Sequence, residues 1–242
     1  MSMTARELAL KVGGHVEGDA ERVIKQCAAR EDAGPGAVAL AQSPAEAGDD
    51  RAVWVVAPGT AQGIKGKTLV VVDDPAWAFR EALVVLHGFR SHPAPGIDEH
   101  AFVDPTAVVG ELCTLRPFVY ISPRTQLGKR SIVYPHCYVG KEATIGDDVV
   151  LYSNVTVYDR CEIGNRVQLH AGAVVGSDAG DCVVRQGRSL RLPVTGRVVI
   201  EDDVEIGANA VIVRPVVGCT VIVAGTRVKE GMVVPAGSRL EG

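Results

Sequence analysis

The sequence lacks an apolar run long enough to cross a membrane, and its first twelve residues lack the continuous apolar stretch of a signal peptide. It has no CxxC pair and no cysteine spacing typical of a structural zinc site. A formal net charge of −4 argues against a nucleic-acid partner. We therefore expect a cytoplasmic protein without an integral membrane segment, a metal site or a nucleic-acid partner. Its 47% hydrophobic residues are enough to build a core without cross-links.

An aliphatic residue recurs every six positions from Val103 to Val175. A small or β-branched residue stands four positions after each one, and glycine often follows directly, as at Gly146 and Gly164. We expect these glycines to supply the permissive backbone angles of a tight corner. A period of six fits a short strand plus a corner, and three such sides close a coil of about 18 residues. The pattern predicts a mainly β fold, a left-handed parallel β-helix of hexapeptide repeats, in which coils stack about 4.8 Å apart.

The distribution of residue types along the sequence divides the chain into three parts. Residues 1–88 are expected to form a small N-terminal α/β domain, residues 89–101 a linker rich in proline and glycine, and residues 102–242 the β-helix. Residues 177–197 interrupt the repeat and are expected to loop out of it as an insertion. The register then slips by four residues between Ile212 and Ile222.

Local signals place elements in the first domain. Thr4 and Glu7 form a capping-box pattern that opens a helix, and Asp74-Pro75 opens a second helix that runs through Leu86. Buried strands are expected at residues 37–41, 52–57 and 69–72.

Three of the six cysteines, Cys113, Cys137 and Cys161, lie 24 residues apart and share one position of the repeat. A small buried apolar side chain suits that position. We expect free buried thiols rather than disulfides or metal ligands.

Two segments of the repeat, LYSNVTVYDRCEIGNRVQLHAGAVVGSD (residues 151–178) and GRVVIEDDVEIGAN (residues 196–209), resemble UDP-3-O-acylglucosamine N-acyltransferases. The opening ARELALKVGGHVEGDAERVI (residues 5–24) resembles the first helix and strand of the same family. The resemblance implies an enzyme of lipid A biosynthesis that moves a hydroxyacyl chain from acyl carrier protein to the amine of a UDP-linked amino sugar. It also implies a homotrimer with no bound cofactor, and a uridine-binding role for the first domain. Family members continue for several coils and a helical extension beyond the matching part.

The sequence departs from the family at positions that bear on chemistry. The family's general-base histidine falls in register on Ala236, and no histidine follows His170. The uracil-stacking aromatics fall on Leu40 and Glu46, and a family asparagine falls on Ser43. Two hypotheses remain open: a divergent N-acyltransferase with a replaced base, or a non-catalytic trimeric relative that serves as a binding or assembly scaffold.

Candidate site residues follow from these matches. Histidine suits a general base near neutral pH, so His170 is the catalytic candidate, while a hydrogen-bonded corner residue is the structural alternative. The substrate-binding candidates are Ser43, Asp178, Arg197 and Arg214. His136 is expected to be a surface corner residue. Because it lies nearly two coils from His170, roughly 10 Å along the axis, the pair does not suit a zinc carbonic anhydrase.

Two surfaces have expected partners. One is basic and either steers the acidic acyl carrier protein or forms an ordinary solvated surface. Its residues are Arg185, Arg188, Arg191 and Arg197 of the insertion and Arg214, Arg227, Lys229 and Arg239 of the last coils. A face of β-branched residues such as Val155, Val157 and Val174 is expected to be covered in a homotrimer.

Overall fold

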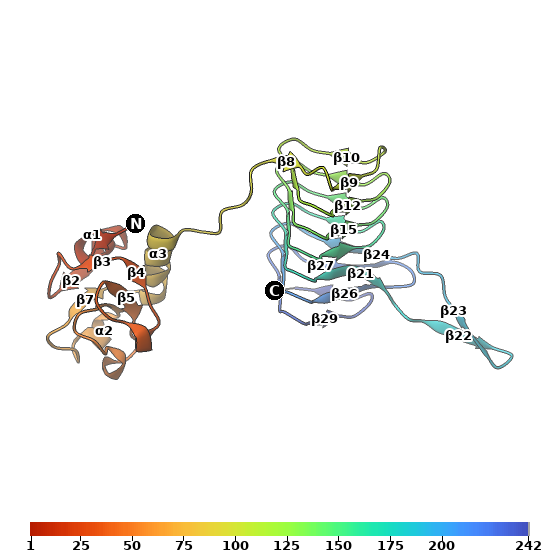
Figure 1. Cartoon of the computed structure of the whole chain (residues 1–242). Helices are drawn as coiled ribbons and strands as arrows, with labels where there is room; N and C mark the ends of the chain where they lie inside the picture. Colours follow the sequence, from red (N-terminus) through yellow and green to blue (C-terminus); the bar gives the residue numbers. More distant parts are fainter. Residues whose placement is uncertain (242) are drawn as a thin grey trace. The chain divides into compact units, whose positions relative to one another are not determined.

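The computed structural model describes residues 1–241, which divide into two compact units, residues 1–91 and residues 92–242. The first is a small α/β unit and the second is a long stack of coils (Figure 1). Among residues 1–241, no helix has the length and apolar character needed to cross a membrane.

The first unit is built on a five-stranded sheet in the order β2-β7-β6-β5-β4, in which β4 to β7 are parallel and β2 is antiparallel to β7. Helices α1 and α3 pack on this sheet. The strands and helices of the unit are β1 (Met3–Thr4), α1 (Ala5–Lys11), β2 (His15–Glu17), β3 (Val23–Ile24), β4 (Gln26–Cys27), η1 (Arg30–Asp32), β5 (Ala37–Leu40), η2 (Pro44–Glu46), β6 (Val53–Val56), α2 (Pro58–Ala61), β7 (Thr68–Val71) and α3 (Pro75–His87).

Both predicted helix starts are confirmed. The Thr4 hydroxyl accepts the Glu7 backbone N–H at 3.2 Å, and the Glu7 carboxylate accepts the Thr4 N–H at 2.7 Å. The Asp74 carboxylate accepts the backbone N–H of Trp77 at the start of α3. Each cap satisfies an N–H that has no partner within its helix. The three predicted strands correspond to β5, β6 and β7, which are almost entirely buried.

The second unit is the predicted parallel β-helix of hexapeptide repeats, with three seven-stranded parallel sheets. The first sheet contains β8 (Gly96–Ile97), β11 (Thr114–Leu115), β14 (Ile132–Val133), β17 (Val150–Leu151), β20 (Gln168–Leu169), β25 (Glu205–Ile206) and β28 (Arg227–Val228). The second sheet contains β9 (Phe102–Val103), β12 (Tyr120–Ile121), β15 (Tyr138–Val139), β18 (Thr156–Val157), β21 (Val174–Asp178), β26 (Val211–Arg214) and β29 (Val233–Val234). The third sheet contains β10 (Val108–Val109), β13 (Gln126–Leu127), β16 (Thr144–Ile145), β19 (Glu162–Ile163), β24 (Arg197–Ile200), β27 (Cys219–Ile222) and β30 (Arg239–Leu240).

The recurring aliphatics fill the interior of the coils. Leu127, Ile145 and Ile163 pair in register across the third sheet and are buried, as are Cys113, Cys137 and the other small residues of the repeat. The cysteines are free thiols, as predicted. Val155 and Val157 belong to this interior too, and are fully buried. The expectation that they form an outer face was therefore wrong. Each of the three sides of a coil has two positions that point inward, and Val155 and Val157 occupy these positions.

The role expected for the corner glycines holds at Gly176, whose φ is 89°, and was wrong at Gly146 and Gly164. Positive φ falls three residues after the core aliphatic, at non-glycine residues such as Asp148 (57°) and Arg166 (56°). There the backbone N–H donates to the preceding coil, as from Asp148 to the Lys129 carbonyl at 2.9 Å. Gly146 is needed for a different reason: a Cβ there would lie 2.7 Å from the Gly164 carbonyl group of the next coil.

The first coil begins earlier than expected, and the insertion is shorter than expected. Strand β8 starts the first sheet at Gly96, within the expected linker of residues 89–101. The excursion from the coils is confined to residues 179–196, because Asp178 pairs with Arg214 and Arg197 pairs with Cys219 in the sheets. The longer strands β26 and β27 of the next coil supply these partners. Within residues 179–196, β22 (Cys182–Arg185) and β23 (Arg188–Arg191) form an antiparallel hairpin that projects from the stack (Figure 1).

Candidate functional site

His170 lies at the corner between the first and second sheets, directly after the core residue Leu169. Tyr134 and Tyr152 occupy the same position in the two preceding coils. The three rings stack, with centroids 5.4 Å apart between the tyrosines and 5.0 Å between Tyr152 and His170, the latter pair only 6° from parallel. This stack fixes the plane of the imidazole.

The stack of rings ends where the next coil has a glycine at the equivalent position. Leu169 pairs with Ile206, so Gly207 follows His170 in register. Because Gly207 has no side chain, space remains beside the imidazole. His170, Glu205, Gly207, Ala208 and the segment of residues 227–230 line a pocket of about 450 Å³ there.

Glu205 links the imidazole to a cation. Its Oε1 lies 2.8 Å from His170 Nε2, and its Oε2 lies 2.6 Å from an Arg227 Nη atom. A carboxylate can only accept, so Nε2 carries the proton and the lone pair of the neutral ring lies on Nδ1. The side chains of His170 and Glu205 are each about one third exposed, at 35% and 32%. The site therefore combines a positioned base, a carboxylate that stabilises its protonated form and access to ligands.

Ala236 lies on another edge of the coils. It follows β29 in the second sheet and precedes β30 in the third, and it is exposed. Within one chain, His170 therefore does not replace a side chain at Ala236. His136 lies on the same edge as His170 and stacks on Phe118, with ring centroids 5.1 Å apart. Within the described chain, no three His, Cys, Asp or Glu side chains gather in an arrangement that could hold a metal ion.

Two of the substrate-binding candidates contact each other. Asp178 Oδ1 lies 2.8 Å from Arg214 Nε and 2.7 Å from an Arg214 Nη atom. Arg214 also donates to the Asp159 carbonyl at 3.1 Å and lies 5.4 Å from the centroid of the Tyr158 ring, with a side chain only 9% exposed. These contacts direct most of its donors to groups of the protein itself.

The other two candidates lie apart from this pair. Arg197 is paired with Glu162 at 2.8 Å on the third sheet. Ser43 precedes η2 in the first unit. Near it, Leu40, Glu46 and Phe79 line a pocket of about 260 Å³, together with Ala28, Ala29, Arg30 and Gln42. The Gln42 backbone N–H, which donates to Glu46 at 2.9 Å, and nearby Arg30 hold the pKa of that carboxyl below its usual value.

Two residues of these sites, Glu205 and Phe79, were not singled out from the sequence, and Arg227 was considered only as part of a basic patch. Glu205 and Arg227 lie beyond the insertion, whose length hides the coil spacing that brings them to His170. Phe79 comes from α3 and not from the segment where the resemblance places aromatics. The outward position of Glu205, directly before a core aliphatic, is the one signal that pointed to an exposed carboxylate on the first sheet.

Comparisons with known proteins identify the family. Residues 142–177 match the bacterial transferase hexapeptide family of six repeats. The chain is 50% identical to UDP-3-O-acylglucosamine N-acyltransferase from Syntrophotalea carbinolica, over 93% of this chain and 66% of that protein. It is 48% identical to the protein of the same name from Syntrophus aciditrophicus, over 94% of this chain and 64% of that protein. The chain thus spans just under two thirds of the length of these two curated relatives.

Further relatives extend the match. The UDP-3-O-acylglucosamine N-acyltransferase of Xanthomonas oryzae pv. oryzae is 36% identical over 94% of this chain and 68% of its own length. A solved structure of perosamine N-acetyltransferase from Caulobacter crescentus covers 69% of this chain and 79% of its own, at 20% identity and a TM-score of 0.41, too low to carry an argument. None of these names supports a non-catalytic scaffold. The chain belongs to the UDP-3-O-acylglucosamine N-acyltransferase family.

Proposed function

We propose that this chain transfers a hydroxyacyl group from acyl carrier protein to the amine of a UDP-linked amino sugar, a step of lipid A biosynthesis in the cytoplasm. The observation that carries the proposal is the identity of 48–50% to two proteins of that name over more than nine tenths of this chain. The reaction forms a carbon–nitrogen bond and breaks the carbon–sulfur bond of the thioester, and the released thiol takes up a proton.

His170 is the proposed general base. Its Nδ1 accepts a proton from the amine as nitrogen attacks the thioester carbonyl, and the resulting imidazolium is stabilised by Glu205 through Nε2. The proton then passes to the departing thiolate. Arg227, 2.6 Å from Glu205, forms an ion pair with this carboxylate on the side away from the imidazole. Stacking on Tyr152 keeps the ring in one orientation, so that little reorganisation is needed during the reaction.

Ser43 and the pocket beside it are assigned to the uridine, and Phe79 offers that pocket an aromatic ring. Asp178, Arg197 and Arg214 are assigned to the sugar nucleotide. The exposed hairpin of β22 and β23 carries Arg185, Arg188 and Arg191, which suits an encounter with acidic acyl carrier protein.

The proposed assembly is a homotrimer. The outward side chains of the second sheet begin with Phe102, Tyr120 and Tyr138, which stack at 4.7 and 5.8 Å and are 41–47% exposed. Val174, Val211 and Val233 continue the row. This row is apolar except at Thr156, between Tyr138 and Val174, and a row of this kind favours burial against another copy of the chain.

The test is an acyl-transfer assay with hydroxyacyl carrier protein and a UDP-3-O-acylglucosamine. We expect His170→Ala to lower kcat by about 10²–10⁴-fold, as for loss of a positioned base, and Glu205→Gln to cause a smaller loss. His136→Ala is the matched control, because it removes a stacked corner histidine outside the pocket.

Two results would contradict the proposal. Turnover that is indifferent to His170→Ala would place the base elsewhere. A folded wild-type protein with no turnover above the uncatalysed rate would instead favour the scaffold hypothesis, for which Ala236 at the family's base position is the motivating observation.

A further inference from the structure

The corner between the second and third sheets carries a column of polar side chains, one from each coil, of which three are charged. Thr106, Arg124, Glu142 and Arg160 occupy equivalent positions 18 residues apart. Arg124 donates to Glu142 from Nε at 3.0 Å and from an Nη atom at 2.5 Å. This pairing, together with the charges of Lys141 and Arg160, holds the pKa of the Glu142 carboxyl below its usual value.

The column breaks off after Arg160, because Asp178, the next residue at this spacing, continues strand β21 and pairs with Arg214 before the chain leaves the coils in the hairpin insertion. In the next coil the corresponding corner is formed by the return of the chain at Thr195 and Arg197. Within residues 1–241, no carboxylate lies within ion-pair distance of the Arg160 guanidinium. Arg166, at the neighbouring corner of the same coil, is by contrast paired with Asp203 at 2.7 Å. Arg160 is therefore a charge that the repeat leaves without its ion-pair partner.

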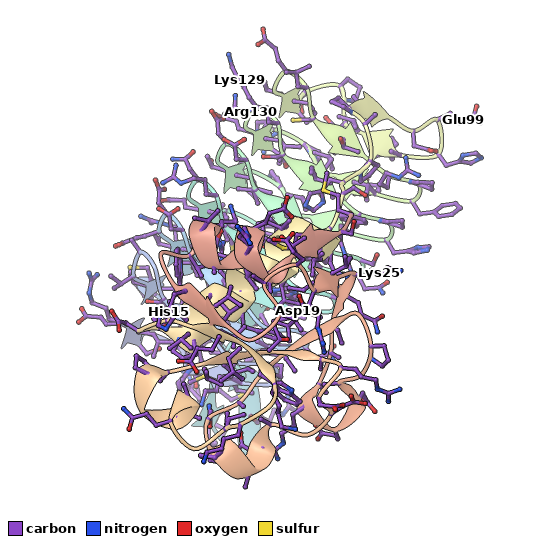
Figure 2. All side chains as sticks on the ribbon, turned by 90° about the vertical axis from the view of Figure 1, so that its left-hand side faces the viewer. His15, Asp19, Lys25, Glu99, Lys129 and Arg130 are labelled. Carbon is purple, nitrogen blue, oxygen red and sulfur yellow. The ribbon has the colours of Figure 1, made fainter. Side chains whose placement is uncertain are left out.

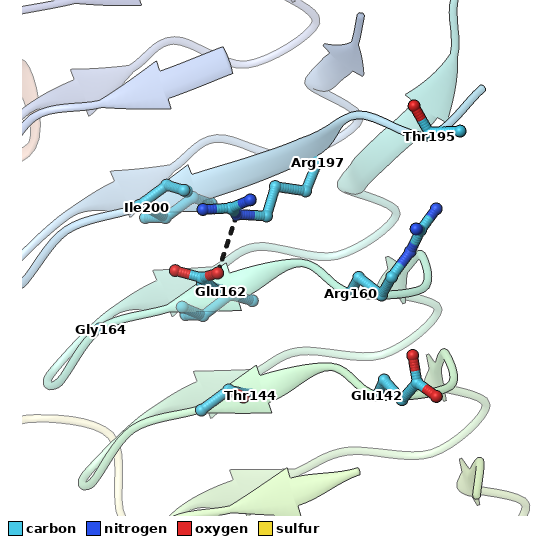
Figure 3. A pocket seen from close by; sticks show the side chains of 10 residues that line it. Glu142, Thr144, Arg160, Glu162, Gly164, Thr195, Arg197 and Ile200 are labelled. Carbon is cyan, nitrogen blue, oxygen red and sulfur yellow. Dashed lines mark ion pairs between the residues drawn. The ribbon is translucent and has the colours of Figure 1, made fainter. Parts of the chain in front are cut away.

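This charge borders a pocket of about 600 Å³ (Figure 3). Arg160 points from its turn towards Thr195, and Arg197 is engaged with Glu162 on the adjacent strands (Figure 3). Ile163, Val199, Ile200 and the hydroxyl-bearing Thr144 complete much of the lining. The lining carries two glutamates and two arginines, and among these four Arg160 alone has no ion pair within the described residues.

We propose that this pocket binds a phosphate group, with Arg160 as its anchor. A guanidinium without an internal partner offers two parallel N–H groups to phosphate oxygens, and the pocket has the volume of a small-molecule site. The same chemistry is carried by a diphosphate, as in a nucleotide sugar, and by the phosphate ester of a pantetheine arm. The choice of these ligands rests on the proposed function, whereas the test measures binding without turnover, so loss of acyl transfer and loss of phosphate binding are distinguished.

Calorimetric titration of the full chain at low salt, with inorganic pyrophosphate and with phosphopantetheine as separate probes, tests the proposal. We expect Arg160→Gln to weaken binding at least about tenfold, the loss of one charge-assisted contact, and Arg160→Lys to weaken it less. Tighter binding of pyrophosphate would assign the site to a diphosphate, and tighter binding of phosphopantetheine to a phosphate monoester.

Arg166→Gln is the matched control. Both arginines are exposed, both have positive φ (58° and 56°), and they stand in the same coil. We expect binding to be unchanged in Arg166→Gln. Equal affinity in the wild type and Arg160→Gln would overturn the proposal, and so would an equal loss in both variants, because that result would mean attraction by net charge alone.

Discussion

At the scale of single residues, the cysteines illustrate how burial controls reactivity. Burial raises the pKa of Cys137 to about 12 and that of Cys161 to about 11, and it also raises the pKa of Cys113. Only the thiolate is a strong nucleophile, so a raised pKa and lack of access act together. Cys182 and Cys219, by contrast, are exposed.

We predict that a thiol reagent such as Ellman's reagent modifies Cys182 and Cys219 rapidly in the native protein at pH 8. Cys27, whose pKa burial raises to about 11, should react more slowly, and the three core thiols only after unfolding in denaturant. Mass spectrometry of peptides after a timed reaction identifies the modified positions. Rapid modification of Cys137 in the folded protein would mean that the coils open readily.

At the scale of the structural element, the coil depends on uninterrupted apolar stacking. Ile145 is 2% exposed and lies between Leu127 and Ile163 in the third sheet. We predict that Ile145→Asp prevents folding, because an unpaired carboxylate would be buried between two coils. Ile145→Val is the control and should cost only about 0.5–1.5 kcal/mol. Circular dichroism and gel filtration measure the outcome, and a folded Ile145→Asp protein would contradict the register.

The corners are held by charge pairs between successive coils. Arg130 pairs with Asp148 at 2.6 Å and Arg166 pairs with Asp203 at 2.7 Å. Lys129 and Arg130 project outward from their corner (Figure 2). The hydrogen bonds from these arginines hold the pKa values of Asp148 and Asp203 below the usual value. Their stabilising contribution is therefore present above the unfolded pKa of about 4 and is lost as pH falls through the folded value.

We predict that the urea midpoint falls between pH 6 and pH 3, and that it falls less in Arg166→Gln, where the Asp203 pKa returns towards its usual value. The shift for one exposed pair is small, so both proteins are compared at the same concentration and ionic strength. An equal fall in the two proteins would show that the Arg166 pair contributes nothing to acid sensitivity.

At the scale of the whole molecule, the proposed trimer depends on the apolar row of the second sheet. We predict a mass of three times 25.5 kDa by light scattering at micromolar concentration. Tyr120→Glu should shift the protein towards monomer, because it places a charge in the middle of the row. Lys129→Glu is the control on another edge. A wild-type mass of 25.5 kDa would contradict the trimer.

The repeat architecture was predictable from the sequence because each coil buries its own aliphatics, and this burial imposes a period of six along the chain. The capping box at Thr4 and the start of α3 were equally local. These features depend on residues that are close to one another in the sequence, so the pattern of residue types is enough to predict them.

The tertiary structure alone decided which polar groups meet across coils. His170 and Glu205 are 35 residues apart because the hairpin separates adjacent coils, and no periodicity indicates that pairing. Asp178, the residue 18 positions after Arg160, lies in the longer strand β21 and pairs with Arg214 instead of Arg160. The need for glycine at Gly146 likewise comes from the backbone of the next coil. Such contacts depend on the distance between stacked coils and on where the chain leaves the coils. Which residues form the core, by contrast, follows from the hydrophobic effect acting at each repeat.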